Sequence, residues 1–167
     1  LVTDGLPAIA LGFEPAEKDI MMQPPRDTKE SIFARGLTEL ILFRGIFLGL
    51  STLAVFTTTL YFTGDVATAK TAAFATLVLT QLIHVFECKS EKRNIFEIPF
   101  LNNIALILAV CCSLSMLLAV IYIPALRGIF KTVSLLSSDW TIILGFSFLG
   151  PVLASLFISK RRSGRKK

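Results

Sequence analysis

A carboxylate inside an apolar segment at the start of the chain is the first candidate for chemistry. Asp4 and its neighbour Thr3 stand in the otherwise apolar segment 1–13, and Gly5 and Pro7 follow them closely. Glycine and proline interrupt helices, so this composition predicts a broken helix. Discontinuous membrane helices bind cations through side chains and freed carbonyl groups, and a hard cation such as Ca²⁺ prefers oxygen ligands. We therefore predict Asp4 and Thr3 as cation ligands; the alternative is that Asp4 caps a helix end.

A second set of polar side chains lies further along the chain at helical spacing. Gln81 and His84 are three residues apart and Cys88 follows four residues later, so all three share one face of a helix. Interhelical hydrogen bonding is the interpretation that this stripe favours, and direct ion binding is the alternative. The adjacent Cys111 and Cys112 point in different directions and are expected to pack as small apolar residues.

The composition is that of a membrane protein. Of 167 residues, 53% are hydrophobic and 17% are charged, whereas about a quarter of the residues of a soluble domain are charged. The charge-free segments 45–64, 98–126 and 140–159 are each long enough to cross a bilayer, which requires about 20 apolar residues. The segment 71–86 spans only if residues 67–69 extend it. With one histidine and no phosphate-binding or nucleophile motif, the sequence excludes the common soluble-enzyme sites.

We predict an all-α fold, a polytopic transmembrane helix bundle in which four complete spans follow the end of a preceding broken span. The predicted segments, in chain order, are the end of a transmembrane helix with the ion-site motif (1–13), a cytoplasmic loop (14–36), two transmembrane helices (37–63 and 67–88), a cytoplasmic loop (89–97), a transmembrane helix (98–124), an exterior loop (125–138), a transmembrane helix (139–159) and a basic cytoplasmic tail (160–167).

The lysines and arginines predict the orientation of these spans. Of the 17 Lys and Arg residues, the far side of a four-span bundle receives Lys70, Arg127 and Lys131. Positive residues concentrate on the cytoplasmic side of membrane proteins, so both ends of the chain are expected to be cytoplasmic. The net charge of +5 then requires no nucleic-acid partner, because a basic tail suits topology and anionic lipids. The lipid bilayer is the partner that the sequence predicts.

A resemblance to a known family is carried by the run Thr3-Asp-Gly-Leu-Pro-Ala-Ile-Ala-Leu-Gly-Phe-Glu-Pro15. It resembles the end of the sixth transmembrane helix and the following loop of a P-type cation-transporting ATPase, in the version of the calcium pumps of the sarco/endoplasmic-reticulum type. The similarity continues through Asp19-Ile-Met-Met-Gln-Pro-Pro-Arg26. The four later spans agree with the family's last four helices in number and orientation, and the short exterior loops indicate a bacterial version in the cell membrane.

The resemblance implies roles for single residues. Asp4 falls on the family's calcium-ligating aspartate, and Thr3 falls on a hydroxyl ligand of one of its ion sites. Glu17 and Asp19 match acidic loop positions that couple the membrane sites to the phosphorylation domain, so 14–36 is the expected coupling loop. Gln81 falls where the two-site pumps carry a ligating glutamate. The second site is then weakened, and we expect one Ca²⁺ per transport cycle.

The resemblance also implies what the rest of the protein supplies. ATP and Mg²⁺ bind outside this chain, in the cytoplasmic ATPase domains that carry the phosphorylated aspartate, and further N-terminal helices complete the membrane part. The intact protein is thus expected to be an ATP-driven Ca²⁺ transporter, with the chain inactive by itself. Two alternatives remain, a free-standing four-helix membrane scaffold or regulatory subunit, and a P-type pump for Mn²⁺, Na⁺ or H⁺.

Overall fold

The computed structural model describes residues 2–14, 37–89 and 103–149. All regular secondary structure in these ranges is helical, as expected: α1 (Val2–Leu11), α2 (Leu37–Thr63), α3 (Val66–Glu87), α4 (Ile104–Tyr122), α5 (Pro124–Phe130) and a further helix over residues 137–149.

Three of these helices, α2, α3 and α4, are long and apolar enough to cross a membrane. The described part of the last helix, residues 137–149, is shorter than the roughly 20 residues that a span requires. The count of four spans therefore stays a prediction. Most of the predicted loops 14–36 and 89–97 and the tail 160–167 lie outside the described residues.

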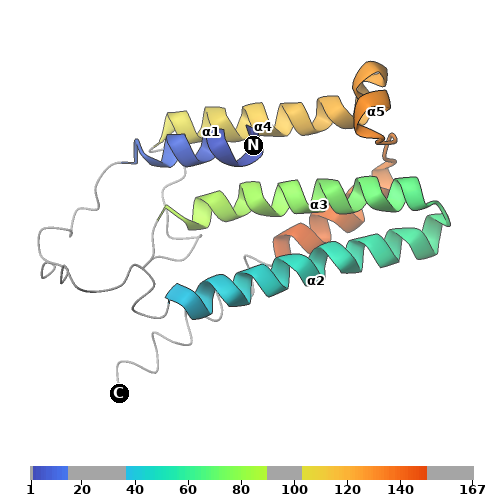
Figure 1. The fold of residues 1–167 in the computed structure, drawn as a ribbon, viewed down its shortest axis with the longest axis horizontal. Coiled ribbons are helices and arrows are strands. Elements are labelled where there is room, and N and C mark those ends of the chain that lie inside the picture. The colour runs from blue at the N-terminus through green and yellow to red at the C-terminus, as the bar shows by residue number, and fades with distance from the viewer. Residues whose placement is uncertain (1, 15–36, 90–102, 150–167) are drawn as a thin grey trace, which may run out of the picture.

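Helices α2 and α3 form an antiparallel pair joined by a tight turn (Figure 1). Gly64 occupies this turn with a φ of +65°, which glycine adopts without strain. The carboxylate of Asp65 caps α3 by accepting hydrogen bonds from the backbone N–H groups of Ala67 (3.2 Å) and Thr68 (2.9 Å). The Thr68 hydroxyl donates a further bond of 2.6 Å, and these bonds lower the pKa of Asp65 from its ordinary value.

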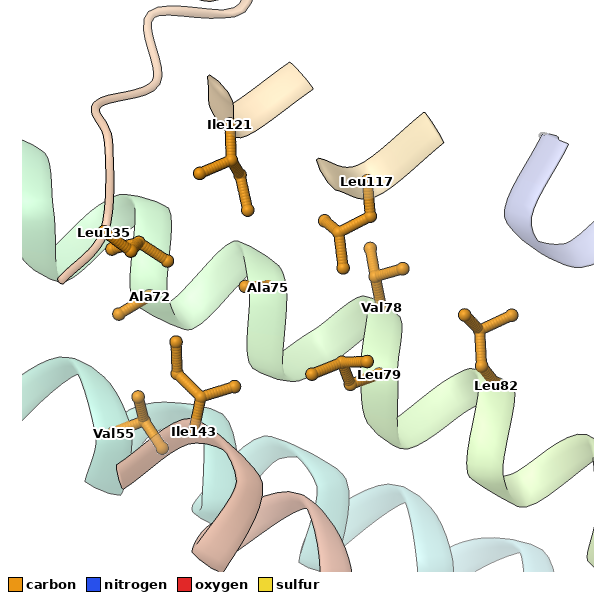
Figure 2. Close-up of a cluster of buried hydrophobic side chains, with 10 residues drawn as sticks. All are labelled: Val55, Ala72, Ala75, Val78, Leu79, Leu82, Leu117, Ile121, Leu135 and Ile143. Carbon is orange, nitrogen blue, oxygen red and sulfur yellow. The ribbon is translucent and has the colours of Figure 1, made fainter. Parts of the chain in front are cut away.

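Helix α3 is the central element of the bundle, since it packs against α1, α2 and α4. Figure 2 shows its buried side chains meeting residues of α2, α4 and the last helix. Small residues on α3, such as Ala72 and Ala75, are fully buried and let the neighbouring helices approach closely. The cluster comprises Val55, Ala72, Ala75, Val78, Leu79, Leu82, Leu117, Ile121, Leu135 and Ile143.

Buried threonines on α3 satisfy their hydroxyl groups within the helix. Thr71, Thr76 and Thr80 each donate a hydrogen bond of 2.8 Å to the carbonyl oxygen four residues earlier. An unpaired hydroxyl is costly in an apolar environment, so this local bonding allows polar residues to occupy a helix of membrane type.

Helix α1 differs from the sequence prediction. Gly5 and Pro7 were expected to break any helix in this segment, but the backbone is helical from Val2 to Leu11 with Pro7 inside it. Proline removes one helical hydrogen bond, the bond to the carbonyl of Thr3. Pro7 and Ala10 are buried, and α1 packs on α3 and α4. This burial offsets the loss, so the prediction of a broken backbone helix is wrong.

The predicted exterior loop 125–138 contains most of a short helix, α5. Pro124 occupies the first turn of α5, where its fixed φ favours a helix start. Lys131 ends the helix in the left-handed conformation with a φ of +54°. The following segment is tied to the bundle, because the backbone N–H of Val133 donates to the hydroxyl of Thr71 on α3 at 3.1 Å.

Candidate cation site and the polar layer at the helix ends

The predicted cation ligands Thr3 and Asp4 belong to the start of α1. Their backbone is helical, and their side chains are outside the described part of the structure. Pro7 offers no N–H to the Thr3 carbonyl, so this oxygen is available as an acceptor beside Asp4. Because Ca²⁺ takes about six to eight oxygen ligands, Thr3 and Asp4 require further ligands to complete a site.

A cluster of histidine, cysteine and carboxylate side chains suited to a metal ion is not found among the described residues. Within residues 2–14, 37–89 and 103–149, no group of three or more His, Cys, Asp or Glu side chains is placed to hold a metal ion. The predicted coupling residues Glu17 and Asp19 lie outside these ranges.

Helix α1 has one packed side and one uncovered side within the described structure. Pro7 and Ala10 are buried, whereas the side chains of Leu6 and Ile9 are 40% and 65% exposed. No atom lies within 4 Å of a Cβ built on Gly5. The uncovered side thus offers an apolar face with space for further protein.

The predicted stripe of Gln81, His84 and Cys88 lies on α3 and just beyond its end. Gln81 is half-buried. His84 Nδ1 lies 2.9 Å from Glu87 Oε2, and His84 Nε2 lies 3.7 Å from Cys88 Sγ. The structure therefore brings His84 and Cys88 together. Both partners of His84 belong to the same stretch of chain, so these contacts are not the interhelical hydrogen bonds that the stripe was expected to form.

An ion pair joins α2 to α3. Arg44 Nη2 lies 3.3 Å from Glu87 Oε2, and their side chains are 20% and 8% exposed. The Nε of Arg44 is buried and has no hydrogen-bond partner among the described residues. The carboxylate of Glu87 is buried and requires a partner, so Arg44 is the group from α2 that stabilises its charge.

A second group of contacts joins α1 to α3 and α4. Glu14 Oε1 lies 3.3 Å from Lys89 Nζ, just beyond the end of α3. Asn103 Nδ2 donates hydrogen bonds of 2.9 Å to Glu14 Oε2 and to the carbonyl of Ala10. The same Asn103 caps α4, because its Oδ1 accepts from the N–H of Leu106 at 2.9 Å.

These two groups form what we call the helix-end polar layer. The ends of α1 and α3 and the starts of α2 and α4 lie at the same end of the bundle (Figure 1). The sequence analysis did not predict that these residues form one layer. The charges at the ends of the apolar segments, and the asparagine that precedes one of these segments, were the signals that indicated it. The layer consists of Glu14, Arg44, Glu87, Lys89 and Asn103.

The chain matches known proteins along nearly its whole length. The family model described as "Cation transporting ATPase, C-terminus" matches residues 1–160. The "Calcium-transporting ATPase" of Bacillus subtilis (strain 168) is 43% identical over 164 residues, which cover 97% of this chain and 18% of that protein. For the "Calcium-transporting ATPase 1" of Bacillus cereus the identity is 33% over 165 residues, covering 89% and 18%. For the human "Calcium-transporting ATPase type 2C member 1" it is 32% over 166 residues, covering 99% and 18%.

These relatives are much longer proteins, since the chain spans 18% of the length of each. The matched residues include the run from Thr3 to Pro15 on which the resemblance was based. The helical structure with three segments of membrane type agrees with this match. The chain therefore belongs to the family of C-terminal regions of cation-transporting ATPases.

Proposed function

We propose that the chain is the C-terminal membrane part of an ATP-driven P-type Ca²⁺ transporter. The observation that carries the proposal is the combination found in α1, where Thr3 and Asp4 precede a buried Pro7 in a helix packed on α3 and α4. The match to the cation-transporting ATPase family supports the transport mechanism, and the names of the relatives support Ca²⁺ as the transported ion.

In this proposal Asp4 and Thr3 supply oxygen ligands to the Ca²⁺ in transit. A hard cation binds carboxylate and hydroxyl oxygens, and the Thr3 carbonyl released by Pro7 is a further acceptor in the same turn. The remaining ligands come from the N-terminal helices of the pump. These helices cover the open side of α1 that carries Leu6 and Ile9, which excludes water and lipid from the site.

Transport is coupled to ATP by movement of α1. ATP and Mg²⁺ bind in the cytoplasmic domains of the intact protein, where an aspartate is phosphorylated. The loop 14–36, with Glu17 and Asp19, transmits the movement of these domains to α1 and changes the access and affinity of the site. The four spans of this chain brace the site, since α1 packs on α3 and α4.

The amide at Gln81 predicts the number of ions moved. An amide brings no negative charge to a position where the two-site pumps carry a carboxylate, so a second Ca²⁺ binds there weakly. We expect a ratio of one Ca²⁺ per ATP in the reconstituted intact pump, and a ratio of two would contradict this part of the proposal.

The same proposal places the chain in a bacterial cell membrane with four spans and both ends in the cytoplasm. Apolar side chains on α2 support contact with lipid or with other helices, since Ile46, Leu50 and Leu53 are 63%, 58% and 58% exposed. Single exposed apolar residues are ordinary on soluble proteins, but a row of them along a membrane-type helix is not.

Substitution of Asp4 tests the central assignment. In the intact pump we expect Asp4→Asn to raise the Ca²⁺ concentration for half-maximal ATPase activity by more than about 100-fold, because even the outer-shell partners of metal ligands are worth 10–100-fold. Asp65→Asn is the matched control, because asparagine also caps helices and Asp65 lies in the turn between α2 and α3. The control variant should keep normal activation.

Two results would contradict the proposal. Normal Ca²⁺ activation of the Asp4→Asn variant would exclude Asp4 as a ligand. Activation of the unmodified pump by Mn²⁺, Na⁺ or H⁺ in place of Ca²⁺ would exclude the proposed ion while leaving the family assignment intact.

A further inference from the structure

We propose that Glu14 is a positioning residue that anchors the loop-side end of α1, so that α1 bends at Pro7 and does not slide along α3 and α4. The role rests on the proposed transport function, since it concerns movement of the helix that carries Asp4. Glu14, Lys89 and Asn103 are called the α1 clamp below.

The α1 clamp uses both oxygens of one carboxylate. Glu14 Oε1 pairs with Lys89 Nζ at 3.3 Å, beyond the end of α3, and Glu14 Oε2 accepts from Asn103 Nδ2 at 2.9 Å, at the start of α4. Asn103 Nδ2 donates a second bond of 2.9 Å to the carbonyl of Ala10 in the last turn of α1. The end of α1 is thereby fastened to two helices that are distant from it in sequence.

Burial makes the clamp depend on the charge of Glu14. The side chain of Lys89 is 1% exposed, so water scarcely reaches its ammonium group, and the carboxylate of Glu14 compensates this buried charge. The side chain of Glu14 is 23% exposed, so water reaches it, and we expect its bond to Asn103 to remain when Lys89 is changed. Loss of the carboxylate is therefore expected to disturb the clamp more than loss of the ammonium group.

The two halves of α1 differ in how firmly they are held. After Pro7, Ala10 is buried, and the chain leaves the helix through short bonds from Gly12 N to Ile9 O (3.0 Å) and from Glu14 N to Leu11 O (3.0 Å). These bonds tighten the last turn.

Before Pro7, the helix lacks one hydrogen bond, and a Cβ on Gly5 would meet no atom within 4 Å. Helices bend at proline, so with its other end held, α1 responds to forces by rotating about the clamp and bending at Pro7.

Spin labels test the clamp without reference to activity. In the intact pump, with the native cysteines replaced, labels are attached at positions 13 and 108, where Phe13 just beyond the end of α1 and Leu108 on α4 are 72% and 64% exposed. We expect Glu14→Gln to broaden the distribution of distances between the two labels. We expect the double variant Glu14→Gln/Lys89→Met to restore a narrow distribution, because no buried charge is left and the introduced amide oxygen still accepts from Asn103.

A functional measurement separates positioning from catalysis. Glu14→Gln should raise the Ca²⁺ concentration for half-maximal ATPase activity by at least about fivefold, the lower end of typical coupling between sites, with a smaller effect on the maximal rate. Lys89→Met should give a smaller rise. The matched controls are Asp65→Asn and Lys70→Met, which change exposed groups at the far end of α3 and should leave the distances and the activation unchanged.

The clamp is overturned if Glu14→Gln leaves the distances and the Ca²⁺ activation unchanged, or if the double variant is disturbed as much as the single one. If Glu14→Gln does not fold, Asn103→Ser is the variant that tests the clamp, because serine still caps α4 but is too short to reach Glu14. An unchanged distance distribution in this variant contradicts the clamp, and a broadened distribution supports it. An unmodified pump without Ca²⁺ activation contradicts the transport function alone, and the label distances still decide the clamp.

Discussion

The Arg44–Glu87 ion pair between α2 and α3 gives the sharpest prediction about stability. Arg44 Nη2 lies 3.3 Å from Glu87 Oε2, and Glu87 is the less exposed partner, at 8% against 20%. His84 Nδ1 also lies 2.9 Å from the same carboxylate oxygen. Replacing one partner strands the other, and the cost depends on how well the stranded group is hydrated or hydrogen-bonded.

The expected magnitudes follow from these exposures. Arg44→Met strands the buried carboxylate and should lower the free energy of unfolding by about 3 kcal/mol, the lower end of the cost of breaking a buried pair, because His84 remains as a partner. Glu87→Gln keeps an oxygen acceptor beside the partly exposed Arg44, so the expected loss is about 1.5 kcal/mol, the worth of a hydrogen bond to a charged group. The double variant should lose no more than about 3 kcal/mol, so the coupling energy is at least about 1.5 kcal/mol.

A double-mutant cycle measures this coupling. The free energy of unfolding of the intact pump in mixed micelles is determined for the unmodified protein, both single variants and the double variant. Arg44→Met combined with Asp65→Asn is the control, because Arg44 lies in the first half of α2 and Asp65 lies beyond its far end, so their effects should add. The reasoning is refuted if the losses of the two single variants sum to the loss of the double variant to within about 0.5 kcal/mol, because independent sites behave in that way.

Two further predictions concern the turns at the other end of the bundle. Hydrogen bonds from Thr68 and Ala67 lower the pKa of Asp65, so its carboxylate stabilises α3 above the unfolded-state pKa near 3.8 and this contribution is lost as the pH falls through the lower folded-state pKa. Asp65→Ala should therefore reduce the thermal unfolding midpoint at pH 7 but not at a pH below both pKa values, and an equal reduction at both would contradict the capping role. Lys131 holds a φ of +54°, so Lys131→Gly should stabilise the protein by up to about 1 kcal/mol. Lys131→Val should destabilise it, and the reverse order of unfolding midpoints would show that this backbone conformation is not present.

Several features of the chain follow from local properties of the sequence. The length of the apolar segments predicted the helical membrane class, and α2, α3 and α4 are helices of the required length and hydropathy. The residues from Thr3 to Pro15 predicted the family that the comparisons then identified. Thr3 and Asp4 were predicted as ligands on the same local basis, and their role stays part of the proposed function.

The sequence misjudged the backbone of α1 and did not anticipate the short helix α5, because packing and backbone geometry outweigh composition in both places. Gly5 and Pro7 were expected to break a helix, but a proline removes one hydrogen bond, and burial of Pro7 and Ala10 against the bundle offsets that loss. The segment after Pro124 was expected to be a loop, but proline favours the first turn of a helix and Lys131 can end it in the left-handed conformation.

The sequence by itself determined which segments are apolar, where each ends and which charges flank it, because hydropathy and helix capping depend on neighbouring residues. Only the tertiary structure decided which of those charges meet. Asn103 and Glu14 are 89 positions apart, and Glu87 pairs with Arg44 on another helix. Spacing along the chain says nothing about such pairs. They form because packing the helices through α3 removes the charged groups from water and leaves opposite charges as the partners within reach.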